Sequence, residues 1–145
     1  MKNMTINLLL LLMLGAISSC KDKVSPAVAS VNENYTSDLG KAKKWIVGSW
    51  KLVAVSVMVP NPAVPNVQLV VNNNQITVIE DGKQIDNVSY EIEKTASSMQ
   101  LKTNAEPRTD NWYVRNPVLQ ISENKMYLDL GRAADLPAFD FERVK

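Results

Sequence analysis

Hydrophobic and polar positions alternate along most of the chain after its first third. The clearest segment has Val88, Tyr90 and Ile92 on one side and a serine and two glutamates on the other. Strict alternation with one polar face is typical of a half-buried antiparallel strand. The run from Trp50 to Val59 is too rich in β-branched valine for a stable helix. The same alternation recurs in shorter segments at residues 99–101, 119–121, 126–130 and 139–143.

Turn signals separate these strands. Asp81-Gly82 is the strongest, because this dipeptide adopts the positive φ angles of a tight primed hairpin turn. Asn72-Asn73-Asn74 separates predicted strands at Val67–Val71 and Gln75–Ile79, and Glu123-Asn124 marks a later turn. About eight short strands joined in this way must close into a barrel or pack as a sandwich, since both control edge strands. Sequential hairpins favour an all-β fold, a small antiparallel up-and-down β-barrel.

A short helical turn is expected before the strands. Ser37 and Asp38 are favourable caps for a turn that runs through Lys44, although Gly40 weakens it. Residues 20–37 are rich in Ser, Ala, Val, Asn and Pro and have no lasting periodicity, which indicates a flexible tether. Residues 38–145 suffice for one domain with one core.

The first nineteen residues have the order of a secretory signal. Lys2 supplies a basic start, Leu8–Leu14 is apolar throughout, and small residues then lead into Cys20. The apolar stretch is too short to span a bilayer as a helix, so residues 1–19 are predicted to be a removable signal peptide. Ile17-Ser18-Ser19-Cys20 resembles the bacterial lipobox, which implies a lipid on Cys20. The alternative is a generic signal that ends in a chance cysteine, but this is the only cysteine in the chain and has no disulfide partner.

Charge and residue types restrict the chemistry that the chain can perform. It has 16 basic and 15 acidic residues, and removal of Lys2 with the signal leaves fifteen of each, so no nucleic-acid partner is expected. The absence of histidine excludes Ser-His and Cys-His catalysis and the commonest metal ligand. We therefore expect no enzyme activity, no cofactor and no metal. The C-terminal carboxylates are numerous enough for a glycosidase pair, but solvated surface charge is the preferred interpretation: Asp129, Asp135, Asp140 and Glu142.

Two segments resemble a known family. Gly48-Ser49-Trp50, just after the tether, resembles the Gly-x-Trp opening of the lipocalins and their calycin relatives. In that family the tryptophan plugs the closed end of the barrel, and a basic residue from the last strand packs across its ring. Arg143 is the matching residue, and the resemblance implies a structural clamp between Trp50 and Arg143. The ending from Ile121 to Val144 looks like that of lipocalin-like lipoproteins of Bacteroidota, although this chain is shorter than ordinary lipocalins and has no C-terminal helix.

Candidate ligand-binding residues follow from this expectation. The interior of such a barrel holds either side chains or one small ligand. Four residues are therefore candidates both for the packed core and for the wall of a ligand pocket: Tyr90, Met126, Phe139 and Phe141. Trp112 and Tyr113 either stack on a sugar, project into the barrel mouth, or serve as half-buried strand aromatics. The stiff apolar loop Val59–Pro65 is either a lid, as in lipocalins, or a rigid connection.

The resulting hypothesis is a non-enzymatic lipoprotein, held in the membrane through Cys20, that binds a small apolar or amphipathic ligand at the open end of the barrel. The alternative is an envelope interaction module that binds a protein or a glycan through its loops or outer face, with a packed interior. A solvent-accessible apolar cavity favours the first hypothesis, and a packed interior with an exposed aromatic patch near Trp112 and Tyr113 favours the second. The expected location is the cell envelope, in the outer membrane, facing the periplasm or the exterior.

Overall fold

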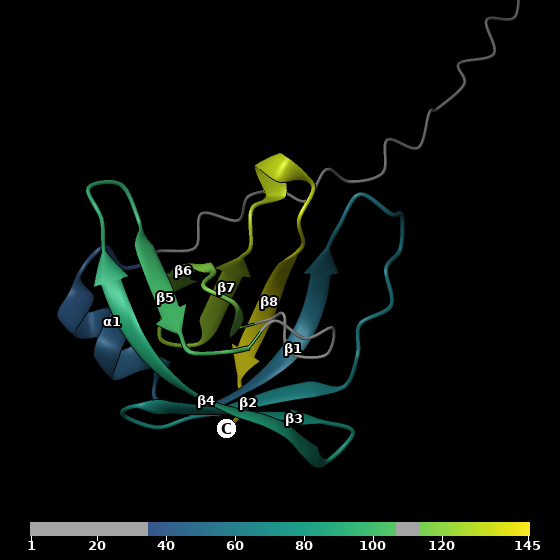
Figure 1. The fold of residues 1–145 in the computed structure, drawn as a ribbon, viewed down its shortest axis with the longest axis horizontal. Coiled ribbons are helices and arrows are strands. Elements are labelled where there is room, and N and C mark those ends of the chain that lie inside the picture. The colour runs from purple at the N-terminus through teal and green to yellow at the C-terminus, as the bar shows by residue number, and fades with distance from the viewer. Residues whose placement is uncertain (1–34, 107–113) are drawn as a thin grey trace, which may run out of the picture. The chain divides into compact units, whose positions relative to one another are not determined.

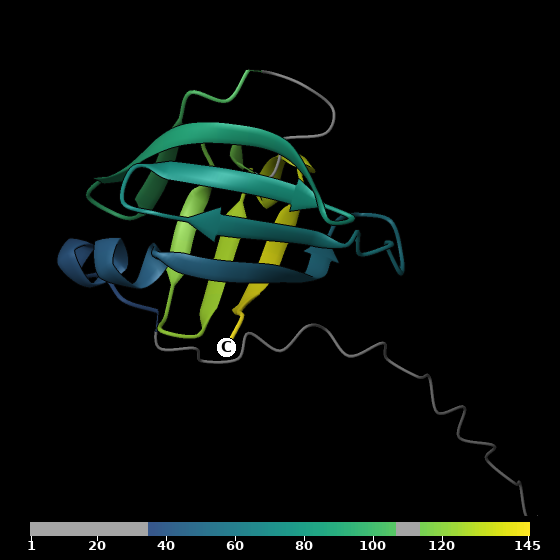
Figure 2. The same ribbon diagram turned by 90° about the horizontal axis from the view of Figure 1, so that it is seen from below.

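The computed structural model describes residues 35–106 and 114–145. These residues form an α-helix, a short 3-10 helix and eight strands; the strands close into an antiparallel barrel in sequence order, which confirms the predicted fold class (Figure 1). Figure 2 shows the strands from β1 to β4 crossing in front of β6 to β8, as two walls of that barrel. The elements are α1 (Leu39–Ile46), β1 (Gly48–Ser56), β2 (Val67–Val71), β3 (Gln75–Glu80), β4 (Lys83–Lys94), β5 (Met99–Thr103), β6 (Val118–Ile121), β7 (Lys125–Asp129), the 3-10 helix η2 (Arg132–Ala134) and β8 (Ala138–Arg143).

The barrel closes because β1 pairs with both β2 and β8. Trp50 lies opposite Leu69 on one side and opposite Arg143 on the other. Closure gives every strand two neighbours and removes free sheet edges. The up-and-down order also sorts the connections between two ends. We call the end that carries the β1–β2, β3–β4, β5–β6 and β7–β8 connections the open end, and the end that carries α1 the closed end.

The strongest turn signal forms the tight turn that the sequence predicts. Asp81 and Gly82 have φ angles of 49° and 76°, and they join β3 to β4. Both values lie in the left-handed region that a primed hairpin turn needs, and Asp and Gly tolerate this region better than most residues. This turn fixes the register in which Glu80 pairs with Lys83.

The predicted helical turn is present and extends two residues beyond Lys44. Asp38 is its N-cap, and its Oδ1 accepts a hydrogen bond of 2.7 Å from the Lys41 backbone N–H. Ala42 and Ile46 are fully buried against the barrel core, while the lysines between them are exposed. Packing of this apolar stripe offsets the weak helix propensity of Gly40.

The first strand ends earlier than the valine pattern predicts. We expected a strand from Trp50 to Val59, but β1 spans Gly48–Ser56. Its last partner on β8 is Ala138, which follows Pro137. Proline has no backbone N–H to donate to a ladder, so Val57 and its followers have no strand to pair with and enter a connection instead.

Apolar side chains from every strand fill the barrel interior. These core residues are at most 5% exposed, so their side chains pack against one another in the barrel interior. Ala42 and Ile46 of α1 belong to the same core and cover the closed end. The strand residues of this core are Trp50, Leu52, Val67, Leu69, Val71, Ile76, Val78, Val88, Ile92, Met99, Leu101, Leu119, Ile121, Met126, Leu128, Phe139 and Phe141.

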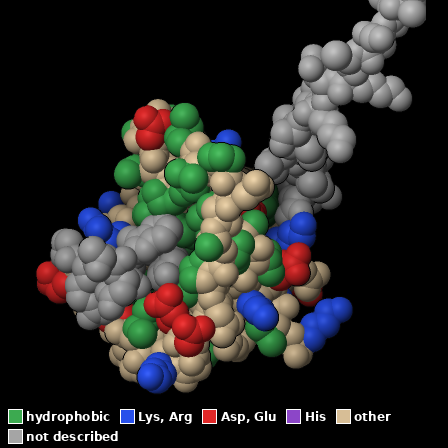
Figure 3. All heavy atoms as spheres, turned by 90° about the vertical axis from the view of Figure 1, so that its right-hand side faces the viewer, with side chains coloured by type: hydrophobic (Ala, Val, Ile, Leu, Met, Phe, Trp, Pro, Cys, Tyr) green, Lys and Arg blue, Asp and Glu red, His purple; other side chains and the backbone are tan. Residues whose placement is uncertain are grey.

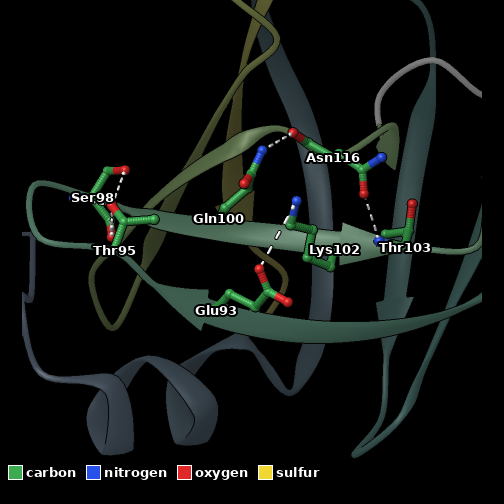
Figure 4. Close-up of polar contacts among 7 residues, drawn as sticks. All are labelled: Glu93, Thr95, Ser98, Gln100, Lys102, Thr103 and Asn116. Atoms are coloured by element: carbon green, nitrogen blue, oxygen red, sulfur yellow. Dashed lines mark hydrogen bonds and ion pairs between the residues drawn. The ribbon is translucent and has the colours of Figure 1, made fainter.

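Side chains reinforce the seam between β5 and β6. In the described part of the chain, the ladder there pairs Met99 with Leu119 and Gln100 with Val118, and the Leu101 backbone N–H donates a 2.9 Å hydrogen bond to the Pro117 carbonyl. Toward the open end, the Asn116 side-chain oxygen accepts a 2.9 Å bond from the Thr103 backbone N–H, and the Asn116 carbonyl accepts from the Gln100 amide (Figure 4). Asn116 therefore closes part of the barrel wall in place of a strand backbone.

Candidate functional site

The closed end contains the contact that the family resemblance implies. Trp50 is fully buried, and its Nε1 donates a 2.8 Å hydrogen bond to the Ile46 carbonyl at the end of α1. The Arg143 guanidinium carbon lies 4.3 Å from the Trp50 ring centroid. A guanidinium at this distance is attracted by the electron-rich face of the indole.

Arg143 also donates hydrogen bonds to three backbone carbonyls. Its Nε donates to the Glu123 carbonyl over 2.6 Å, one terminal nitrogen donates to the Val47 carbonyl over 3.0 Å, and the other donates to the Trp45 carbonyl. Gly48 makes room for this group, because a Cβ at that position would overlap an Arg143 nitrogen. Gly48 also has a φ angle of 136°, which side-chain-bearing residues rarely adopt, so both the backbone conformation and the arginine favour glycine here.

The interior residues predicted as ligand contacts are part of the packed core. Met126, Phe139 and Phe141 are at most 1% exposed. Tyr90 is half-buried, and its hydroxyl donates a 2.7 Å hydrogen bond to the Asn72 carbonyl at the β2–β3 turn. Burial raises the pKa of the Tyr90 hydroxyl above its ordinary value. Trp112 and Tyr113 lie outside the described residues, so their predicted roles remain predictions.

The open end exposes a group of large apolar side chains, which we call the apolar rim. Met58 and Val59 are 79% and 65% exposed, and Leu136 is 49% exposed. Because Ser56 pairs with Ala138, the residues that follow β1 and precede β8 leave the barrel side by side. Figure 3 views this side of the molecule and shows hydrophobic side chains gathered on its upper and central part. The apolar rim consists of Val57, Met58, Val59, Val64 and Leu136.

A cavity of about 330 Å³ adjoins the apolar rim, and its described lining consists of Leu130, Leu136, Pro137 and Arg115. Three of these four residues are apolar, and Arg115 adds one exposed positive charge. The volume lies at the lower end of the range for small-molecule pockets. A ligand with an apolar body and a polar or negative end matches this lining.

The β1–β2 connection that carries most of the rim is fastened at its base. The Asn66 carbonyl accepts a 3.1 Å hydrogen bond from the Asp81 backbone N–H, and the Asn66 side chain reaches the Asp81 carboxylate. The connection is therefore tied to the β3–β4 turn while Met58 and Val59 stay in solvent. Sequence reasoning singled out the loop from Val59 to Pro65 as a lid candidate, but it missed Leu136, which no periodic pattern marks.

Within the described ranges, no three Cys, His, Asp or Glu side chains come close enough to hold a metal ion. In the same part of the chain, no helix has the length and apolar character needed to span a bilayer. Fold and open end together define the class: a small, closed, up-and-down antiparallel β-barrel with a filled interior and an apolar rim. Protein-family models, curated proteins and solved structures give no match to this chain.

Proposed function

We propose that this chain is a non-enzymatic binding protein of the cell envelope, anchored through a lipid on Cys20, that holds a small apolar or amphipathic ligand at the open end of its barrel. The observation that carries the proposal is the apolar rim beside a cavity of about 330 Å³. Contiguous exposed apolar surface on a soluble domain marks a site of interaction, because water is a poor solvent for it.

The filled interior determines where a ligand binds in this proposal. Phe139 and Phe141 occupy the space that an internal ligand would need, and both are at most 1% exposed. A ligand buried deep in the barrel would have to displace this core, which costs several kcal/mol. Binding at the mouth needs no such displacement, so the ligand lies on the rim and in the adjoining cavity.

The lipocalin-like ending and the lipobox support the same proposal from the sequence. The Arg143 contact with Trp50 matches the arrangement that the resemblance implies, and the tether places such a barrel next to a membrane. A membrane is a source of amphipathic molecules. A lipid-anchored carrier would therefore meet its ligand at the surface to which it is attached.

Titration with the amphipathic dye 1-anilinonaphthalene-8-sulfonate tests the site. The mature chain from residue 20, carrying Cys20→Ser so that it stays in solution, should bind the dye saturably, and lauric acid should displace it. Met58→Asp and Leu136→Asp should each weaken binding by about tenfold or more, because a buried side chain of this size contributes roughly 1.5–3 kcal/mol.

Val70→Asp is the matched control. Val70 is also an exposed apolar residue, at 37%, but it lies on the outer wall at β2, away from the open end. Its replacement should leave dye binding unchanged. Equal binding by all three variants would contradict the proposal.

A protein partner is the second candidate function. The observation that favours it is the prominence of Met58 and Val59, the two most exposed large apolar residues in the described part of the chain. Such a loop fits an apolar groove on another envelope protein. Cross-linking from a photoreactive residue at position 58 in intact cells would give a defined protein adduct in this case, and lipid adducts in the first.

A further inference from the structure

A second cavity, of about 300 Å³, lies away from the apolar rim, beside the closed end of the barrel. Three segments form it: residues 35–37 before α1, residues 94–99 around the β4–β5 hairpin, and residues 118–120 of β6. Residues 35–37 belong to the predicted tether, yet they lie against the barrel. The Thr36 backbone N–H donates a 2.9 Å hydrogen bond to the Ile121 carbonyl, and the Lys94 ammonium donates one of 2.7 Å to the Ser37 carbonyl.

The walls of this cavity are rich in hydroxyl groups. Thr95 and Ser98 bond to one another across the hairpin turn, as Figure 4 shows. Within the described part of the chain, the side chains of Ser37, Ser97 and Gln120 make no hydrogen bond, so their donors and acceptors are available. We call this feature the hydroxyl-lined cavity.

Apolar residues also line the hydroxyl-lined cavity. Met99 and Leu119 border it, pair with each other across the β5–β6 seam, and are at most 5% exposed. Tyr35 adds a half-buried aromatic ring to the wall. The site therefore combines an apolar surface with a ring of groups that both donate and accept hydrogen bonds.

The charge of the cavity lining helps to decide between anionic, apolar and neutral polar ligands. Lys94 is the one charged residue in the described lining, and its ammonium is already engaged by the Ser37 carbonyl. That bond to a neutral carbonyl leaves the ammonium charged, so a small anion would find a single positive charge in the described lining and no second cation beside it. A hydrocarbon would cover the hydroxyl and amide groups without replacing their hydrogen bonds to water, which disfavours a purely apolar ligand.

We propose that the hydroxyl-lined cavity is a binding site for a neutral carbohydrate, of the size of a mono- or disaccharide. A sugar ring has an apolar C–H face that matches Met99 and Leu119. Its hydroxyl groups donate and accept hydrogen bonds, as Ser37, Ser97 and Gln120 require. This site is distinct from the open end, and the inference does not depend on the function proposed there.

Amide chemical-shift mapping on the mature Cys20→Ser chain tests this site, with N-acetylglucosamine and maltose as probes. At least one sugar should shift the signals of Ser97, Met99 and Gln120 in a saturable manner. Gln120→Ala should weaken that binding by roughly tenfold, the equivalent of one hydrogen bond. Gln84→Ala, a replacement of an exposed glutamine on β4, should have no effect.

Three results would overturn the inference. The first is the absence of shifts at the cavity with both sugars, and the second is confinement of all shifts to the open end. The third is a response to sodium phosphate in place of the sugars, which would make the cavity an anion site. Each of these outcomes leaves the dye titration of the apolar rim unaffected, so the two proposals are tested separately.

Discussion

At the scale of single residues, Arg143 joins segments from the two ends of the folded chain. Its nitrogens donate to carbonyls of Trp45, Val47 and Glu123, and its guanidinium covers the Trp50 ring. The sequence predicted the pairing of Trp50 with Arg143 from the resemblance of Gly48-Ser49-Trp50 to a known motif and from the phase that Arg143 shares with Phe139 and Phe141. It did not predict the three carbonyl partners, since backbone groups carry no residue-specific signal.

Arg143→Met should destabilise the protein by about 2–3 kcal/mol. The methionine keeps part of the apolar contact with Trp50, but three carbonyls lose a charged donor and the cation–π attraction disappears. Urea unfolding followed by tryptophan fluorescence measures this loss. Arg132→Met is the control, because Arg132 is exposed, and it should cost much less. A loss below about 0.5 kcal/mol for Arg143→Met would show that the clamp contributes little to stability.

Tyr90 should make stability depend on alkaline pH. Burial raises its pKa in the folded state above the ordinary value of 10.0, so its contribution is complete below that pH and is lost as the pH rises through the folded-state pKa. Absorbance at 295 nm should show one tyrosine that ionises later in folded than in urea-unfolded protein. Tyr90→Phe should remove that late component, and an unchanged titration curve would contradict the assignment.

At the scale of elements, the strands were predictable and the ends of some were not. The segment from Val88 to Ile92 has a strict period of two, and the Asp81-Gly82 turn fixes its partner. β1 ends early because its neighbour β8 begins after Pro137. This end depends on the pairing of β1 with β8 in the folded barrel, which the local sequence pattern does not reveal. The short helix η2 was not predicted, since Arg132-Ala133-Ala134 has no apolar periodicity and no side-chain cap.

The β5–β6 seam provides a test at this scale. Asn116→Gly removes the oxygen that accepts the Thr103 backbone N–H, while glycine tolerates the φ angle of 52° at this position. We expect faster hydrogen exchange at the Thr103 amide and a loss of about 1 kcal/mol in stability. Asn116→Asp keeps the acceptor and should retain the protection. Equal exchange in both variants would show that Asn116 does not close the seam.

At the scale of the whole molecule, the sequence predicted a barrel because consecutive hairpins leave few other ways to remove sheet edges. It favoured a core role for Phe139 and Phe141 but left a ligand in the interior open, because aromatic side chains also suit a pocket wall. The structure places both in the core and leaves the apolar rim exposed. The sequence pointed to part of the rim, the loop from Val59 to Pro65, but not to Leu136, because the two connections that carry these residues meet only in the closed barrel.

The proposed anchor is tested on the intact protein in its own cells. Incorporation of labelled palmitate and recovery in the membrane fraction should both be lost in Cys20→Ser. Two controls accompany this test. The variant and the wild type are expressed at equal levels, and mass spectrometry of the mature N-terminus shows whether each protein has been exported and processed. A labelled Cys20→Ser protein, or an unlabelled wild type, would contradict the anchor.

The most direct test of the central claim is native mass spectrometry of the gently purified mature protein, compared with its mass after denaturation. We predict a defined extra mass that is lost on denaturation and is absent from Met58→Asp and Leu136→Asp. Val70→Asp should retain it. A protein that is bare, and remains bare after incubation with an extract of envelope lipids, would contradict a ligand at the open end of the barrel.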